Sequence, residues 1–145
     1  MVDIWPSKKR SEVMSRIRKT DSGPEIRLRV CLGQLRMPYQ TYGALPGSPD
    51  IILERSKLAI FVHGCFWHGC PRHYRLPKSN IAYWSQKLRR NVARDKAVRK
   101  RIRGMGWHTA VVWECQMKNP ERTLYRLLTR VHNLEGVDAN STGIL

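Results

Sequence analysis

An eleven-residue segment rich in histidine and cysteine most constrains how this chain can fold. From His63 to His73 it holds three histidines, two cysteines, a phenylalanine and a tryptophan. Cys65, Cys70 and His73 are spaced so that one loop can wrap a tetrahedral ion, and Cys115 follows a strand-like run that can supply a fourth ligand. The spacing predicts a structural zinc site, and the alternative is free thiols beside a polar loop.

Such a zinc site is closed, so a catalytic metal is expected elsewhere. Asp50 is the candidate because it follows a proline at the start of a buried strand, where a carboxylate can hold magnesium against a phosphodiester. The same Pro-Asp pair is also common in simple turns. His63 and His68 suit general-base and charge-stabilising work near neutral pH, with ordinary loop histidines as the alternative.

Two further acids stand out by position. Glu25 lies in the first turn of an expected helix, where the helix dipole alone favours an acid. Asp95 falls between Val92 and Val98 on the apolar stripe of a basic helix. Because buried acids need partners, we expect Asp95 to hold a histidine or an arginine in place.

The charge balance points to a polyanionic partner. Lys and Arg number 27 against 11 Asp and Glu, giving a net charge of +16 at pH 7. The sequence has neither an apolar run long enough to cross a bilayer nor a signal sequence, which favours a cytoplasmic protein without a membrane partner. We expect the basic helix at 81–103 to contact DNA phosphates, with a merely solvated face as the alternative, through residues that include Lys87, Arg90 and Arg94.

Three aromatic residues lie close to these features. Phe66 and Trp67 are adjacent in the histidine-rich segment, and Trp84 lies near the start of the basic helix. Adjacent residues of a tight loop rarely both point inward, so we expect these rings to form a wedge that enters between base pairs. Packing in the core is the alternative.

Helices and strands alternate along the chain, which predicts a single α/β domain over residues 1–145 with a central mixed sheet flanked by helices. We expect the helix at 24–35 to pack through the face that carries Ile26 and Val30. A basic arm at 1–9, a short helix at 10–19 and a flexible tail at 136–145 complete the prediction. The remaining elements are strands at 51–53, 58–62 and 107–113 and helices at 81–103 and 120–131.

Six separate blocks carry a resemblance to a known family. They are Arg10-Ser11 with Met14, Leu45 through Asp50, Phe61 through His68, Trp84 with Lys87, Asn91 through Asp95, and Gly106-Trp107 through Cys115. Together these blocks resemble the very short patch repair (Vsr-type) DNA mismatch endonucleases. The string from Gly64 to His68, joined to the Trp-Glu-Cys ending, is the most specific part.

The resemblance implies a fold like that of type II restriction endonucleases (PD-(D/E)xK type) with a structural zinc added. It implies that Asp50 binds magnesium, that His68 activates water, and that His63, Asp95 and Glu25 support them. It also makes Phe66, Trp67 and Trp84 the wedge beside the mismatch. The second acid and the lysine of the broad nuclease motif are missing, and Val62 can offer a metal only its backbone carbonyl.

The resemblance further implies a substrate and a reaction. Deamination of 5-methylcytosine leaves thymine opposite guanine, and a magnesium-dependent nick 5′ to that thymine in double-stranded DNA would start very short patch repair. This implies a monomer with a functional link to a cytosine-5 DNA methyltransferase, and leaves a link to mismatch-repair proteins open. A nicking or restriction-like nuclease without mismatch preference, or a zinc-stabilised DNA-binding module without catalysis, remain alternatives.

Overall fold

A small mixed sheet forms the centre of the molecule. The computed structural model describes residues 22–41 and 43–141, with 137–141 as backbone only, so the predicted arm and the helix at 10–19 lie outside the described residues. The strands β1 (Ile51–Leu53), β2 (Leu58–His63) and β3 (His108–Trp113) lie in the order β1-β2-β3. β1 is antiparallel to β2, and β2 is parallel to β3. The predicted α/β architecture with a mixed sheet is confirmed.

The connections follow from the strand directions. β1 and β2 are joined by a tight turn in which Lys57 adopts a left-handed conformation with φ of 50°. Parallel strands need a long crossover, and here the short helix α3 (Cys65–His68) and the long helix α4 (Ile81–Gly104) provide it between β2 and β3. The histidine-rich segment is thus the first part of this crossover.

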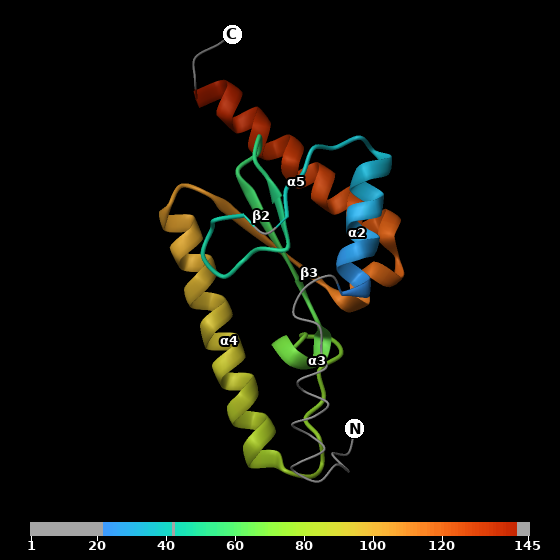
Figure 1. Ribbon diagram of the computed structural model, residues 1–145, viewed down its shortest axis with the longest axis vertical. Coiled ribbons are helices and arrows are strands. Elements are labelled where there is room, and N and C mark those ends of the chain that lie inside the picture. The colour runs from blue at the N-terminus through green and yellow to red at the C-terminus, as the bar shows by residue number, and fades with distance from the viewer. Residues whose placement is uncertain (1–21, 42, 142–145) are drawn as a thin grey trace.

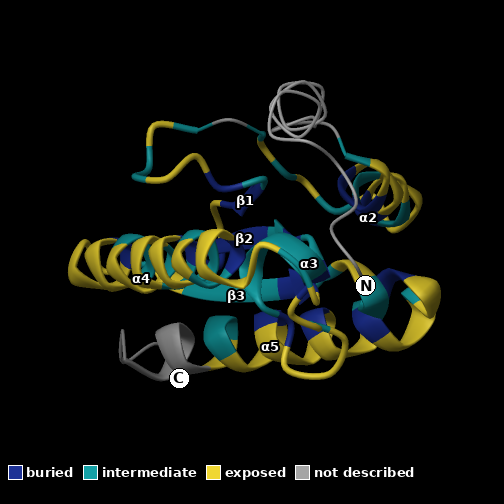
Figure 2. Ribbon diagram, turned by 90° about the horizontal axis from the view of Figure 1, so that it is seen from below, coloured by how far each residue is buried: buried dark blue, intermediate teal, exposed yellow. Residues whose placement is uncertain are grey.

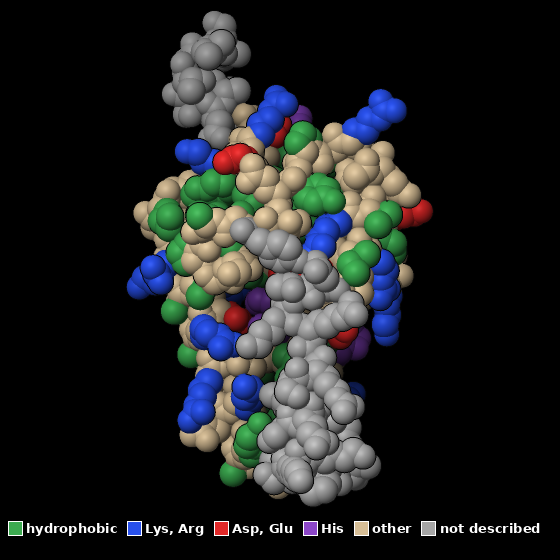
Figure 3. Space-filling view, in the orientation of Figure 1, with side chains coloured by type: hydrophobic (Ala, Val, Ile, Leu, Met, Phe, Trp, Pro, Cys, Tyr) green, Lys and Arg blue, Asp and Glu red, His purple; other side chains and the backbone are tan. Residues whose placement is uncertain are grey.

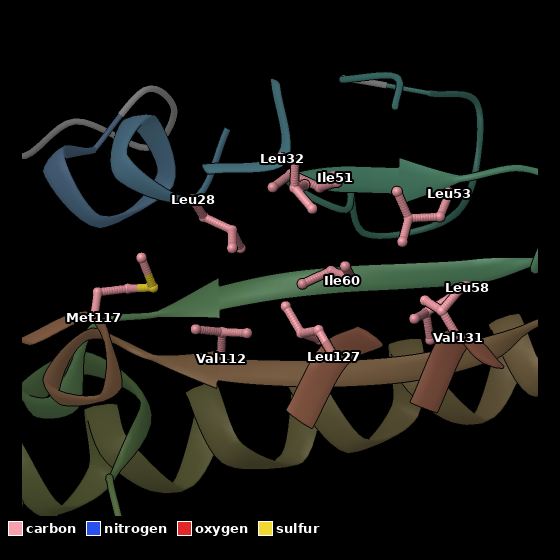
Figure 4. Packing of buried hydrophobic residues seen from close by; sticks show 10 residues of the cluster. All are labelled: Leu28, Leu32, Ile51, Leu53, Leu58, Ile60, Val112, Met117, Leu127 and Val131. Atoms are coloured by element: carbon pink, nitrogen blue, oxygen red, sulfur yellow. The ribbon is translucent and has the colours of Figure 1, made fainter. Parts of the chain in front are cut away.

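Helices cover both faces of the sheet (Figures 1 and 2). On one face, α2 (Gly23–Gln34) and α5 (Pro120–Ser141) pack over the larger core, together with the 3-10 helix η1 (Glu114–Lys118). Figure 4 shows Leu58 and Ile60 of β2 among the side chains of this core. On the other face, Ile102 of α4 packs against Ala59 and Phe61. Alternate β2 residues therefore pack into the two cores, because successive side chains of a strand point to opposite faces of the sheet.

The helix α2 begins where the sequence predicts, but it buries a different face. The side chain of Ser22 caps its first turn by accepting a hydrogen bond from the Glu25 amide. Ile26 and Val30, the predicted inner face, are exposed, whereas Leu28 and Leu32 are fully buried. The prediction of the packing face was wrong because the helix carries two offset apolar rows. Periodicity alone does not choose between them.

The two long helices agree with the sequence to different degrees. Along α4 the predicted stripe faces inward, with Ile102 fully buried and Leu88, Val92 and Val98 half-buried. α5 continues to Ser141, well beyond the predicted end at residue 131. No helix in the described part of the chain has the length and apolar character needed to cross a bilayer.

Candidate active site and metal centre

The parallel register of β2 and β3 brings the chemically important residues together. His63, the last residue of β2, is paired with Trp113, the last residue of β3. Cys65 and Cys115 each follow two residues later, so both lie beyond the same end of the sheet. In α/β proteins ligands commonly bind outside the carboxyl ends of the strands, which is where this register places them.

The four predicted zinc ligands form one cluster. Ligand atoms of Cys65, Cys70, His73 and Cys115 all lie within 4.8 Å of one another. The Sγ atoms of Cys70 and Cys115 are 3.8 Å apart, and Sγ of Cys70 is 3.8 Å from Nδ1 of His73. Two thiolates on one tetrahedral zinc, with Zn–S bonds of about 2.3 Å, would be about 3.8 Å apart. Three sulfurs and one imidazole nitrogen are a donor set that fits zinc.

The thiols of this cluster differ in acidity before any metal binds. Burial raises the pKa of Cys65 to about 12. Burial acts in the same direction on Cys70, but hydrogen bonds from the Arg72 backbone and from His73 outweigh it and lower the pKa to about 7. A divalent cation would supply the positive charge that lets all the thiols ionise together.

A cleft of about 950 Å³ lies next to this cluster. α2, the loop before β1, the end of β2, α3, α4 and Glu114 form its walls. In Figure 3, histidine and acidic side chains reach the surface in the middle of the molecule, with Lys and Arg side chains beside them. The predicted site residues that line the cleft are Glu25, Asp50, Val62, His63, Trp67, His68, Lys87, Arg94 and Asp95.

His68 is held between an acid and another histidine. Its Nδ1 lies 2.7 Å from Oδ2 of Asp95, and its ring stacks on that of His63 with centroids 4.0 Å apart and planes 9° apart. The predicted role of Asp95 as the partner of a histidine agrees with this contact. Burial acts to raise the pKa of Asp95, but the hydrogen bond and charge of His68 outweigh it and lower the pKa.

His63 stays neutral near pH 7. Burial, with the positive charge of His68 second, lowers its pKa to about 4. Ligand atoms of His63, His68 and Asp95 are close enough together to be considered as a metal site. However, imidazole lone pairs lie in the ring plane, so two parallel stacked rings direct them side by side rather than at one ion. The arrangement suits proton transfer better than metal binding.

Asp50 and Glu25 form a second acidic centre in the cleft. Oδ2 of Asp50 accepts a 2.7 Å hydrogen bond from the Val62 amide, and Glu25 is held by Arg29 at 3.0 Å. Burial raises the pKa of Asp50 from its ordinary 3.8 to about 7, and the nearby Glu25 adds to the shift. N–H and C=O of one strand residue point to the same edge, so the Val62 carbonyl faces the Asp50 side of β2. The oxygen ligands around this acid pair are a donor set that fits magnesium.

The three predicted wedge residues pack together. The ring centroid of Phe66 is 4.8 Å from that of Trp67 and 5.2 Å from that of Trp84. Trp84 is buried, whereas Phe66 and Trp67, on α3, are half-buried. Gly69 ends this helix in the left-handed conformation with φ of 70°, and a Cβ there would lie 2.8 Å from Leu88. α3 is therefore seated closely against α4.

Of the predicted phosphate-binding residues, Lys87 and Arg94 line the cleft. Arg90 lies on the exposed side of α4, outside the set of residues that line it. One helix thus offers cations both inside the cleft and on the surface beside it.

Sequence reasoning gave no role to several residues that shape the site. Nδ2 of Asn91 donates a 2.7 Å hydrogen bond to the Trp67 carbonyl, and its Oδ1 accepts from Arg94 at 3.1 Å. Asn91 lies one helical turn before Asp95, and a second polar residue on that stripe was the available signal. Arg29 follows Glu25 at the i, i+4 spacing of a helical ion pair, which was also readable. Arg99 belongs to the basic helix and Glu114 to the Trp-Glu-Cys ending, but the sequence did not predict that both line the cleft.

Comparison with known proteins identifies the family. A family model described as DNA mismatch endonuclease Vsr matches residues 2–74. The chain is 38% identical over 122 residues to the type II nicking enzyme V.XorIIP of Xanthomonas oryzae, covering 82% of this chain and 89% of that protein. It is 32% identical over 131 residues to the DNA mismatch endonuclease Vsr of Escherichia coli, covering 89% of this chain and 84% of that protein.

A solved structure supports the fold. The catalytic domain of the homing endonuclease I-Bth0305I matches with a TM-score of 0.56 and 16% identity, over 79% of this chain and 98% of that one. At this identity the match describes the fold alone. Taken with the family model and the relatives, the chain belongs to the Vsr DNA mismatch endonuclease family, whose members are phosphodiester hydrolases acting on DNA.

Proposed function

We propose that this protein is a magnesium-dependent, strand-specific endonuclease that nicks DNA 5′ to the thymine of a T:G mismatch, on a restriction-endonuclease-like fold. The contact of His68 with Asp95, in a cleft that also holds Asp50 and Glu25, is the observation that carries the proposal. The product would be the starting point for very short patch repair of deaminated 5-methylcytosine.

His68 is the proposed general base. If Nδ1 carries its proton, it donates to Asp95, and Nε2 is then free to accept a proton from the attacking water. The half-buried Asp95 fixes the ring and stabilises the imidazolium that forms, as the acid of a catalytic triad does. His63, stacked on His68 and neutral, can donate a hydrogen bond to the scissile phosphate.

Asp50 and the Val62 carbonyl are the proposed magnesium ligands, with Glu25 acting through the solvent shell of the ion. When bound, the ion would neutralise charge on the scissile phosphate. In this assignment Arg29 holds Glu25 in place, and the Val62 amide orients Asp50. The proposed magnesium site is therefore formed by α2, by Asp50 directly before β1 and by Val62 of β2.

Mismatch preference is assigned to the aromatic cluster. Phe66 and Trp67 would enter the base stack, while the buried Trp84 supports them from behind. A T:G pair is less well stacked than a matched pair, so the deformation costs less at the mismatch. Lys87, Arg90 and Arg94 would hold the phosphates on either side.

The decisive experiment compares nicking of matched and T:G-mismatched duplexes with magnesium, over several methyltransferase recognition sequences. Strand-specific nicking that is much faster on the mismatched duplex than on the matched one is the expected result. Equal nicking of matched DNA would favour a nicking enzyme without mismatch preference; several relatives are named type II nicking enzymes. DNA binding without any cut would favour the non-catalytic module. The monomeric state, the cytoplasmic location and the link to a methyltransferase stay predictions.

Alanine at Phe66 or Trp67 should reduce nicking of the mismatch by about 10- to 100-fold, because each ring contributes about 1–3 kcal/mol when it stacks on a base. Slow nicking of matched DNA should change much less. Single-turnover rates on both duplexes measure the ratio. Tyr125→Ala is the matched control, since this exposed ring lies on α5, away from the cleft. An unchanged ratio in both cluster variants would return these rings to a packing role.

Asp50→Asn should abolish nicking. In magnesium-free buffer at pH 8 the same change should raise the free energy of unfolding. The native carboxyl has a pKa of about 7 against an ordinary 3.8, so the folded state binds the proton more tightly. The Asp50 carboxyl therefore lowers the free energy of unfolding progressively as pH rises from 3.8 to about 7. Asp50→Asn has no such ionisable group, so it removes this destabilisation. Urea denaturation should show a gain of about 1–2 kcal/mol. Glu121→Gln, at an exposed position on α5, is the control. A less stable Asp50→Asn protein would contradict the electrostatic account.

A further inference from the structure

A groove lined by arginines lies at the outer edge of the sheet. β3 is the last strand in the order β1-β2-β3, so within the described residues no strand pairs with its outer edge. α4 and α5 lie on opposite faces of the sheet and flank this edge (Figure 2). Between them and β3 is a cavity of about 330 Å³.

Four cations from two helices converge on this groove. Arg99 and Arg103 come from α4, and Arg126 and Arg130 come from α5. The lining contains no Asp or Glu, and none of the four arginines has an ion pair with a carboxylate of the described residues. Like charges gathered without counter-charge repel, so a bound anion would stabilise the arrangement.

Two of the arginines are oriented over the edge of β3. Nη1 of Arg103 donates to Oγ1 of Thr109 at 3.5 Å, and Nη2 of Arg130 donates to the Thr109 carbonyl at 3.2 Å. The second bond occupies a carbonyl that an added β-strand would need. The edge is therefore better suited to an oxyanion than to an extended peptide.

The groove and the active-site cleft are neighbours along α4. Arg99 lines both hollows, so they share one wall on α4. A polyanion lying in the cleft can extend past this side chain into the groove without leaving a positively charged surface.

We infer that the groove at the edge of β3 binds a phosphate group through its arginines. Planar guanidinium groups match phosphate oxygens and bind them in pairs of parallel hydrogen bonds. Because Arg99 lines both the groove and the cleft, a backbone phosphate of the bound DNA is the favoured source, and a free phosphate is the other source of the same chemistry. This site touches neither the aromatic cluster nor the mismatch, so it stands whether or not the enzyme prefers mismatches.

The test uses Arg126→Ala in the full, zinc-loaded chain, because the Arg126 side chain lines the groove and makes no hydrogen bond or ion pair with another described residue. Fluorescence anisotropy without magnesium follows binding to duplexes of increasing length, without cutting. The variant should bind the longer duplexes about 3- to 10-fold more weakly and show a salt dependence shallower by about one unit of log–log slope. The shortest duplexes, which fill only the cleft, should bind unchanged. Arg122→Ala, from the same helix but outside the groove, is the matched control.

A second arm separates the two sources of phosphate. Calorimetric titration with pyrophosphate compares the wild-type chain with Arg126→Ala and with the charge-reversed Arg126→Glu. Loss of pyrophosphate binding with unchanged affinity for every duplex assigns the groove to a free phosphate. If both variants bind the duplexes and pyrophosphate with the same affinity as the wild type, the inference is overturned. Absence of mismatch-specific nicking would leave all of these binding results unaffected, so the two proposals fail separately.

Discussion

Replacing His68 by alanine is expected to slow nicking by about 10²- to 10⁴-fold, the usual contribution of a general base, with DNA affinity nearly unchanged. The ring nitrogen facing Asp95 is held at 2.7 Å, so the opposite nitrogen is the one group in this pair positioned to take a proton from water. Single-turnover nicking and gel-shift binding, measured on the same mismatched duplex, separate the chemical step from binding.

Two further variants sharpen this result. Asp95→Asn keeps the shape of the partner but removes its charge, so the rate should fall and its pH profile should shift, because the imidazolium loses its stabilising anion. His132→Ala removes an exposed histidine on α5 and should leave the rate as it is. Near-normal single-turnover nicking by His68→Ala would exclude it as the base.

Loss of the metal cluster is expected to have the largest effect on stability. Cys115→Ser should lower the free energy of unfolding by more than about 4 kcal/mol, since removal of a structural metal belongs to the most damaging single changes. Metal analysis should find about one zinc per wild-type chain, as one four-ligand site requires. Urea denaturation and the zinc content of the purified variant provide the two measurements.

Cys31→Ser is the control for this experiment. Cys31 is a free, half-buried thiol on α2, outside the cluster, so its replacement should leave zinc content unchanged and stability nearly so. A wild-type protein that is folded and active without zinc would overturn the assignment of Cys65, Cys70, His73 and Cys115.

Local patterns predicted much of this fold. The short apolar runs that became β1 and β2, the turn between them and the long basic helix α4 all carry their signal within a few residues. The cysteine and histidine spacing predicted a cluster that the structure brings together, because the loop ligands are close in sequence. The position of Asp95 on an apolar stripe predicted a partner, and the partner is His68.

What the sequence did not predict depends on contacts between distant segments. The packing face of α2 is determined by the core beneath the helix. Leu28 and Leu32 are buried there, whereas the equally apolar row of Ile26 and Val30 is exposed. The sequence predicted that the last helix ends at residue 131, yet α5 continues past Gly136, because one glycine costs only about 1 kcal/mol in a helix. Arg99 and Glu114 become site residues only after β3 and α4 meet β2, and no local pattern marks that meeting.

The shared register of β2 and β3 determines where this chain can change length. His63 is paired with Trp113. The zinc ligands, the stacked histidines and Glu114 all lie close to that pair along the chain, so the pair determines their positions. At the opposite end of the sheet, the β1–β2 turn and the glycine-flanked turn after α4 position none of these groups. Relatives can therefore gain or lose residues at that distant end, whereas between His63 and Cys70 a single insertion would separate the metal centre from the base.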